Sequence, residues 1–286
     1  MIIDENKKFL IIGLGLLGGS YAKALSAKGY TVRAIDTNEN SIKYALSNGF
    51  ISEGDTAVNK DFIDNSDIVV FALYPHIFVD WVEENGHLFK AGTIVTDVTG
   101  VKGIIVKKIQ SLMPEGVEFI SAHPMAGKEV SGVENADDSI FKVANYIVVP
   151  TERNTFNAIN ICKDLGETLG FKEVSWLSVE DHDRMIAYLS QLTHCIAVSL
   201  MCANETPGFE RYTGDSFRDL TRIAKINDEM WSELFLSNRE ALLSEMDRYR
   251  ESFDKLYNFI KTENRDGMRE MMRLSTHRRK HFDKKV

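Results

Sequence analysis

The chain has 286 residues, of which 44% are hydrophobic and 27% are charged, an ordinary composition for one large or two smaller globular domains. Its formal net charge is −8, so its surface should repel phosphate backbones, and we expect no nucleic-acid partner. No apolar run approaches the roughly 20 residues of a membrane span, the polar N-terminus is unlike a signal peptide, and the three cysteines lack metal-ligand spacing. We therefore expect a cytoplasmic protein with no membrane partner.

Strand and helix patterns alternate along the first part of the chain. Short runs of strand-forming residues occur at Phe9–Ile12, Thr31–Ile35, Asp67–Phe71, Thr93–Thr96, Glu118–Ser121 and Tyr146–Val149. Helical patterns lie between several of them, at Leu16–Lys28, Asn40–Asn48, Ile77–Asn85, Val101–Leu112 and Phe156–Leu169. This alternation predicts βαβ units in an α/β domain of the Rossmann type, with a mainly parallel, doubly wound sheet.

After Ser178 the pattern becomes purely helical. Helices are predicted over Val179–Asn204, Glu229–Lys261 and Asp266–Phe282. The first of these is apolar around much of its circumference, which is typical of a helix buried on several sides. A small helical domain offers too little cover for it, so we expect a homodimer. The predicted domains are residues 1–177, which bind the nucleotide, and residues 178–286, which bind substrate and dimerise.

A glycine-rich turn joins the first predicted strand to the first helix. Its six residues follow the GxGxxG pattern: Gly13, Leu14, Gly15, Leu16, Leu17 and Gly18. Such a turn places a pyrophosphate on the N-terminus of the helix. Asp36 ends the second strand about 20 residues further on, where a carboxylate binds ribose hydroxyls. The pattern predicts a turn that binds NAD rather than a purely structural turn. Binding of FAD would need further binding segments that the sequence does not show. Leu73 and Tyr74, which follow the third strand, should border the nicotinamide.

His123 is the candidate base. It follows a strand at the same carboxyl edge of the sheet, where ligands of such sheets bind. A neutral imidazole, with an unperturbed pKa near 6.5, suits the removal of a hydroxyl proton. The alternative is a histidine that merely fills a loop.

Further candidates lie on the long predicted helix. Ser190 and His194 are one turn apart and share a face of it. His182 points about a third of a turn away from His194, and we expect it to act at the start of the helix with Asp181 and Asp183.

Three candidates lie beyond the long helix. Asp219 and Arg222, three residues apart, can form a local ion pair, and Trp231 follows nine residues later. A surface ion pair and a core aromatic are the structural alternatives. His277 and His281 have metal-ligand spacing, but the basic residues between them would oppose a cation, so we expect no metal.

Five segments together resemble the prephenate and arogenate dehydrogenase family over nearly the whole chain. They are Gly13–Gly18, Asp97–Lys102, His123–Gly127, His182-Asp183 with Ser190 and His194, and Phe217–Ala224. The resemblance implies the NAD-dependent oxidative decarboxylation of prephenate to 4-hydroxyphenylpyruvate in tyrosine biosynthesis. It implies that His123 binds the ring hydroxyl and takes its proton, that Arg222 holds the ring carboxylate, and that His194 lies near the side chain. In the family, the helical domain is also the dimer interface.

The chain departs from the family pattern at two positions. Many members have serine where Gly100 stands, so here the neighbouring Thr99 is the candidate for the assisting hydroxyl. Many have threonine where Lys128 stands, and a lysine there offers a cation for a substrate carboxylate or is simply an exposed loop residue. The chorismate mutase segment and the C-terminal regulatory domain of some relatives are expected to be absent.

Three other functions compete with this one. The nearest is arogenate dehydrogenase, whose substrate carries an amino acid in place of the keto acid side chain. A dehydrogenase of small hydroxy acids shares the two-domain plan but typically relies on a catalytic lysine in the helical domain. A non-catalytic NAD-binding sensor would need no base, so the combination of His123, His194 and Arg222 argues against it.

Overall fold

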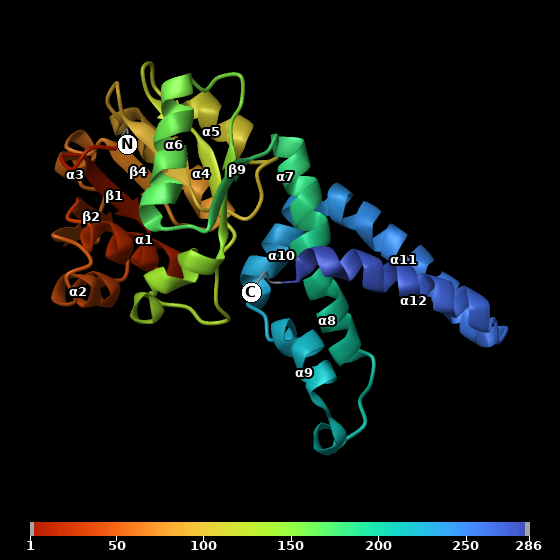
Figure 1. Cartoon of the computed structure of the whole chain (residues 1–286). Coiled ribbons are helices and arrows are strands. Elements are labelled where there is room, and N and C mark those ends of the chain that lie inside the picture. The colour runs from red at the N-terminus through yellow and green to blue at the C-terminus, as the bar shows by residue number, and fades with distance from the viewer. Residues whose placement is uncertain (1–2, 284–286) are drawn as a thin grey trace. The chain divides into compact units, whose positions relative to one another are not determined.

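The computed structural model describes residues 3–283, which form two compact units, one up to Asn238 and one from Arg239 (Figure 1). The first unit is built on a six-stranded parallel sheet with the order β3-β2-β1-β4-β5-β6. Its strands are β1 (Lys8–Ile12), β2 (Thr31–Ile35), β3 (Glu53–Asp55), β4 (Ile68–Phe71), β5 (Ile94–Asp97) and β6 (Glu118–Phe119). The strand order reverses between β1 and β4, and such a switch point is where nucleotides bind. The predicted doubly wound sheet is confirmed.

Both faces of this sheet are buried beneath helices. Along β1, Phe9 and Ile11 enter one core, whereas Leu10 and Ile12 enter the other, because side chains of a strand alternate between its faces. The first core is covered by α1 (Leu16–Ser26), α2 (Glu39–Ser47) and α6 (Phe156–Leu169). The second is covered by α3 (Lys60–Asp64), α4 (Pro75–Asn85) and α5 (Val106–Leu112). The continuous apolar runs of the sequence reflect this two-sided burial.

A second sheet continues from the edge of the first. It contains β7 (Ser121–Pro124), β8 (Asn145–Val149) and β9 (Glu173–Trp176), with β7 antiparallel and β9 parallel to β8. The predicted strand Glu118–Ser121 is therefore two strands, separated at Ile120. His123 lies on β7 opposite Ile147, rather than in a loop after a strand.

The long predicted helix is present but not uniform. It consists of α7 (Val179–Ile186), a π-helical segment (Ala187–Gln191) and α8 (Leu192–Cys202). It ends two residues before the predicted Asn204. Its 24 residues are long and apolar enough to cross a membrane, so the expectation that no run approaches that length was wrong. Length and composition alone do not show that this helix crosses a membrane, because a core helix of a soluble protein can be equally long and apolar.

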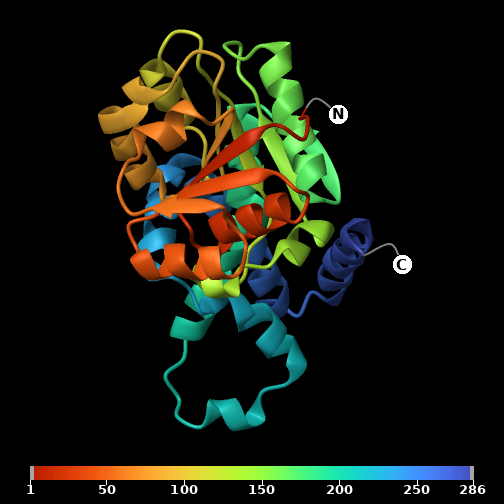
Figure 2. The same ribbon diagram turned by 90° about the vertical axis from the view of Figure 1, so that its left-hand side faces the viewer.

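The rest of the helical region is interrupted more often than predicted. In the first unit, α9 (Asp215–Thr221) and α10 (Asp228–Ser237) follow a loop that Figure 2 shows projecting from the unit. The single helix predicted over 229–261 is wrong, because α10 ends before Asn238. The side-chain amide of Asn238 donates to the carbonyl of Asp183 and to Oε1 of Gln191.

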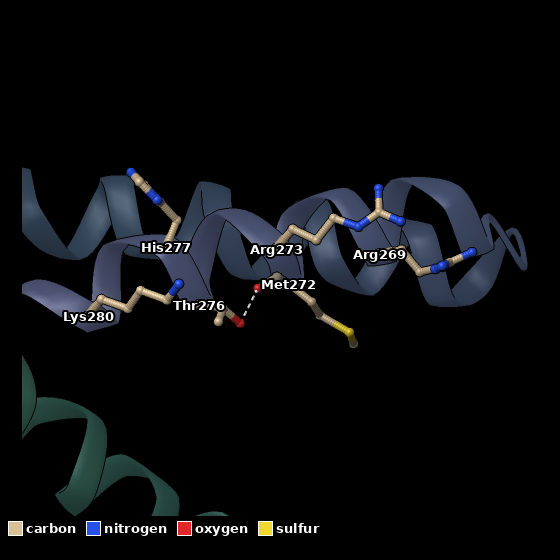
Figure 3. A pocket seen from close by; sticks show the side chains of 6 residues that line it. All are labelled: Arg269, Met272, Arg273, Thr276, His277 and Lys280. Carbon is tan, nitrogen blue, oxygen red and sulfur yellow. Dashed lines mark hydrogen bonds between the residues drawn. The ribbon is translucent and has the colours of Figure 1, made fainter. Parts of the chain in front are cut away.

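The second unit is a hairpin of two helices, α11 (Arg239–Lys261) and α12 (Arg265–Arg279). Along α12 and the 3-10 turn that follows it, six side chains line an open hollow of about 380 Å³ (Figure 3): Arg269, Met272, Arg273, Thr276, His277 and Lys280. The rings of His277 and His281 meet edge to face, with centroids 5.8 Å apart. Within residues 3–283, no group of three His, Cys, Asp or Glu side chains is placed to hold a metal ion.

Candidate active site

The glycine-rich turn forms a cradle in which Gly13 and Gly18 leave no room for a side chain. Gly13 has φ +95°, and a Cβ there would lie 2.6 Å from the carbonyl oxygen of Ala72. A Cβ on Gly18 would lie 1.9 Å from the carbonyl oxygen of Gly13, whereas one on Gly15 would meet nothing within 4 Å. Gly15 is the N-cap of α1 and provides no side-chain cap. The first N–H groups of α1 therefore face open space that suits a pyrophosphate.

The carboxylate of Asp36 is held beside this cradle. Its Oδ2 accepts from the backbone N–H of Leu14 at 2.5 Å, and its Oδ1 accepts from that of Asn38 at 2.7 Å. Such a fixed carboxylate can accept hydrogen bonds from ribose hydroxyls and repels a 2′-phosphate.

The other predicted cofactor residues lie around the same turn. Leu16 begins α1, and Leu17 packs against the core that contains Phe9. Leu73 packs against the opposite core, and Tyr74 is the N-cap of α4. The Tyr74 hydroxyl accepts from the side-chain amide of Asn227 at 3.3 Å, so this edge of the nucleotide site is tied to the helical region.

The imidazole of His123 is bonded to a second histidine. Its Nδ1 lies 2.9 Å from Nε2 of His182, and Nδ1 of His182 lies 2.7 Å from Oδ1 of Asp183. His182 lies near the start of its helix and pairs with Asp183, as expected, but not with Asp181: the N-cap is Ser178, whose hydroxyl accepts from the N–H of Asp181. Burial lowers the pKa of His123 well below 6.5, and His182 and Lys102 lower it further. His123 is therefore neutral at neutral pH.

A buried polar network lies beneath His123. Asp97 and Lys102 are fully buried, and Nζ of Lys102 donates to Oδ2 of Asp97 at 2.8 Å. The same Nζ donates to the carbonyl of Ala122 at 2.7 Å, which fixes the backbone next to His123. Oδ1 of Asp97 accepts from the Ser121 hydroxyl at 2.5 Å. Burial lowers the pKa of Lys102, and the charge of Asp97 opposes that shift.

The Thr99 hydroxyl belongs to the same network. It donates to Oδ2 of Asp97 and accepts from Nζ of Lys102 at 3.3 Å. Thr99 is buried, and its hydroxyl forms hydrogen bonds to Asp97 and Lys102. Its predicted catalytic assistance is a role still to be tested.

His194 and Trp231 form a stacked pair. Their ring centroids are 3.7 Å apart and their planes are inclined by 30°. Nδ1 of His194 donates to the carbonyl of Ser190 at 2.9 Å, because a carbonyl can only accept. The pairing of Ser190 with His194 thus uses the backbone of Ser190, which lies in the π-helical segment. Burial lowers the pKa of His194, which leaves the ring neutral with Nε2 as an acceptor.

Arg222 forms an ion pair with Glu129, not with Asp219. Nη1 of Arg222 contacts Oε1 of Glu129, and both side chains are exposed. The expected pair with Asp219 does not form, because α9 ends at Thr221 and Arg222 begins a 3-10 turn. Among the described residues, no hydrogen bond or ion pair of the Asp219 side chain is found. The helix α8, which carries His194, packs against the 3-10 turn that begins at Arg222, so the ion pair of Arg222 and Glu129 lies near His194.

The sequence prediction missed Glu129 and gave two alternatives for the neighbouring Lys128, a cation for a substrate carboxylate or an exposed loop residue. Nζ of Lys128 lies 2.7 Å from Oδ2 of Asp137, and this contact lowers the pKa of the Asp137 carboxyl. Lys128 therefore has a fixed carboxylate partner. The only available sequence signal for Glu129 was its place just after the segment His123–Gly127.

Two family models match most of the chain. Residues 21–174 match the family model described as "Prephenate dehydrogenase, nucleotide-binding domain", and residues 178–274 match "Prephenate dehydrogenase, dimerization domain". The chain belongs to the prephenate dehydrogenase family. Its members are oxidoreductases, and the family assignment and the cradle around Gly15 together identify the cofactor as NAD.

Individual relatives cover nearly the whole chain. The prephenate dehydrogenase of Bacillus subtilis is 28% identical over 269 residues, which are 91% of this chain and 71% of that protein. The cyclohexadienyl dehydrogenase of Zymomonas mobilis is also 28% identical, over 92% of each chain. The prephenate dehydrogenase of Aquifex aeolicus, solved with hydroxyphenyl propionate and NAD+, superposes with a TM-score of 0.89 at 29% identity, over 97% of this chain and 98% of that one.

For this member of the prephenate dehydrogenase family we predict a strong preference for NAD over NADP. Asp36 would repel a 2′-phosphate, and Thr37 and Asn38 after it provide no cation. Asp36→Ala should weaken the preference, mainly by raising the KM for NAD. The measurement is kcat/KM with each cofactor in both proteins. Equal efficiency of the wild type with NAD and NADP would contradict the prediction.

Proposed function

We propose that this enzyme converts prephenate to 4-hydroxyphenylpyruvate by NAD-dependent oxidative decarboxylation in tyrosine biosynthesis. The observation that carries the proposal is the bonding of His123: its Nδ1 is engaged by His182, so Nε2 is left to accept a proton. The relatives from Bacillus subtilis and Aquifex aeolicus, both called prephenate dehydrogenases, support the same substrate.

In the proposed reaction His123 removes the proton of the ring hydroxyl. NAD, when bound to the cradle of Gly13–Gly18, supplies the hydride acceptor. The ring carbon that bears the hydroxyl gives up its hydride, and the electron pair of the bond to the carboxylate enters the ring as carbon dioxide leaves. The ring becomes aromatic, which drives the step forward, and the proton held by His123 returns to the oxygen, since the product carries a hydroxyl. The protein's task is then to orient the substrate and to present one neutral base.

We assign the substrate carboxylate on the ring to Arg222. A guanidinium can hold a carboxylate through two parallel hydrogen bonds. In the free enzyme Glu129 occupies this guanidinium, so the substrate must displace one carboxylate with another. The stacked pair of His194 and Trp231, which neighbours Arg222, is the proposed wall for the substrate side chain, with Ser190 positioning His194. Asp219 and Lys128 are left as candidates at the edge of this site.

Arogenate is the second candidate substrate, and one observation favours it. Nδ1–H of His194 is used by Ser190, so the neutral ring offers only an acceptor at Nε2. An acceptor suits the ammonium group of arogenate better than the keto oxygen of prephenate. The test is the formation of NADH at 340 nm with prephenate and with arogenate. The proposal requires the higher kcat/KM with prephenate, and a higher value with arogenate would reassign the substrate.

We also propose that the enzyme is a cytoplasmic homodimer without a membrane or nucleic-acid partner. The long helix leaves large apolar side chains uncovered within one chain: Met185, Tyr188, Leu189, Leu200 and Met201. A second copy would remove this surface from water. The description of the second family model as a dimerization domain supports this. Light scattering should give twice the mass of the chain.

A further inference from the structure

Two histidines and a carboxylate form a chain of hydrogen bonds that leads away from the reacting site. His123 comes from β7, whereas His182 and Asp183 come from the first turns of α7. His182 is fully buried and Asp183 is nearly so. The chain therefore joins the nucleotide-binding part to the helical region through a fully buried imidazole.

The carboxylate end of this chain is anchored. Oδ1 of Asp183 accepts from the backbone N–H of Lys102 at 2.9 Å, and Oδ2 accepts from that of Gly103 at 2.7 Å. A Cβ on Gly103 would lie 2.9 Å from this Oδ2, so the loop backbone approaches the carboxylate closely. Both carboxylate oxygens of Asp183 thus accept from backbone N–H groups, and Oδ1 faces the imidazole of His182 as an acceptor.

The carboxylate determines which nitrogen carries the proton on each ring. Asp183 can only accept, so Nδ1 of His182 carries a hydrogen and its Nε2 does not. Nε2 of His182 must then accept from Nδ1–H of His123. It follows that Nε2 of His123 has a free lone pair, which is the form a base needs.

We propose that His182 and Asp183 are positioning residues for this base: they fix its tautomer and take over the positive charge that it acquires. This inference rests on the proposed function, in which His123 accepts the hydroxyl proton. In the transfer, the O–H bond of the substrate breaks and an N–H bond forms at Nε2 of His123. The proton on Nδ1 of His123 passes to Nε2 of His182. The positive charge then lies on the His182 ring, adjacent to the Asp183 carboxylate. One proton enters the pair and none is lost.

The charged groups around the two rings explain why the positive charge should move from His123 to His182. The charged groups that face the two rings are Lys102 and Asp97 from the region of β5, and Asp183 from α7. The Lys102 cation opposes a positive charge on either ring, and Asp97 is already paired with it. Burial lowers the pKa of His182, while its hydrogen bond to Asp183 raises it. Only His182 has a carboxylate in direct contact, so the charge is more stable there than on His123.

His182→Gln tests this inference through the pH dependence of kcat/KM with prephenate. Glutamine can still accept a hydrogen bond from His123, but it cannot take the proton. The charge must then stay on His123 beside Lys102, so the ionisation should move to lower pH by about one unit or more, which is a tenfold change in the proton equilibrium. We expect kcat to fall about tenfold with KM nearly unchanged. A lower kcat with the ionisation at its wild-type pH would overturn the proposal and leave His182 a purely structural role.

Two variants of α7, each of which removes one negative charge, distinguish the hydrogen bond of Asp183 to His182 from a general electrostatic effect of the helix. Asp183→Asn removes the charge at the end of the chain of hydrogen bonds and should also move the ionisation to lower pH. Asp181→Asn removes the same charge two residues away, from a side chain that binds Ser178 and Arg184 instead. An equal shift in both variants would contradict the proposed role of Asp183.

A second measurement needs no turnover. In the free enzyme, labelled with 15N at histidine, NMR should show His123 and His182 both neutral at neutral pH and both protonated at Nδ1. The signal of His182 is identified by its loss in His182→Gln. A proton on Nε2 of His123 would overturn the inference. If these tautomers are found but no proton is taken from the substrate by His123, the proposed function fails while the arrangement of the pair stands.

Discussion

His123→Asn should lower kcat about 10²–10⁴-fold, the typical effect of losing a general base. Asparagine keeps a hydrogen-bonding group next to His182 but cannot accept the proton. Because Arg222, His194 and Trp231 are unchanged, KM for the substrate should change far less than kcat. The measurement is steady-state formation of NADH over a range of pH.

The pH profile provides the second half of this prediction. The base is active when neutral, so the wild-type rate should rise with pH through the ionisation of the hydrogen-bonded pair of His123 and His182. Burial, His182 and Lys102 all disfavour the protonated ring, so this rise should lie below 6.5, at lower pH than the sequence alone suggests. His123→Asn should lack it. His87→Asn, which changes an exposed histidine of the same domain, is the matched control. Near-normal turnover in His123→Asn with the ionisation retained would place the base elsewhere.

The parts of the fold that the sequence predicts are those with strong local patterns. The strand segment Phe9–Ile12 is buried on both faces, so its sequence is continuously apolar. The helix α6 has both a threonine N-cap and a glycine after its last turn. The short strands Glu53–Asp55 and Glu173–Trp176 have no such pattern, and they form because a neighbouring strand supplies hydrogen bonds. The break at Asn238 was missed because its side chain binds groups that lie 47 and 55 residues away.

The candidate site shows the same division. Gly13, Asp36 and His123 were predicted because a motif or the end of a strand fixes their place. The bond of His182 to His123 was missed because helical periodicity relates only residues of the same helix, and His123 lies on β7. Glu129 was missed for a related reason: the ion pair with Arg222 joins residues 93 positions apart. A local ion pair of Asp219 and Arg222 required a helix through both residues, and α9 ends between them.

Arg222→Gln should raise KM for the substrate about 10²-fold, equivalent to roughly 2.7 kcal/mol, while kcat falls less than tenfold. The ring carboxylate is fully charged when the substrate binds, and its charge flows toward the ring as carbon dioxide leaves. An arginine fixed on that carboxylate binds the ground state at least as well as the transition state. Loss of such an interaction appears mainly in KM.

Two companion variants make this prediction specific to the assigned contact. Arg218→Gln removes an exposed arginine of the neighbouring turn, which pairs with Asp215, and should leave KM nearly unchanged. Glu129→Gln removes the carboxylate that competes for Arg222 in the free enzyme, so the ion pair of Arg222 and Glu129 is lost. KM for the substrate should then fall or stay constant. A collapse of kcat in Arg222→Gln with KM unchanged would mean that the guanidinium acts on the transition state. In that case the developing charge, and not the bound carboxylate, would be the partner of Arg222.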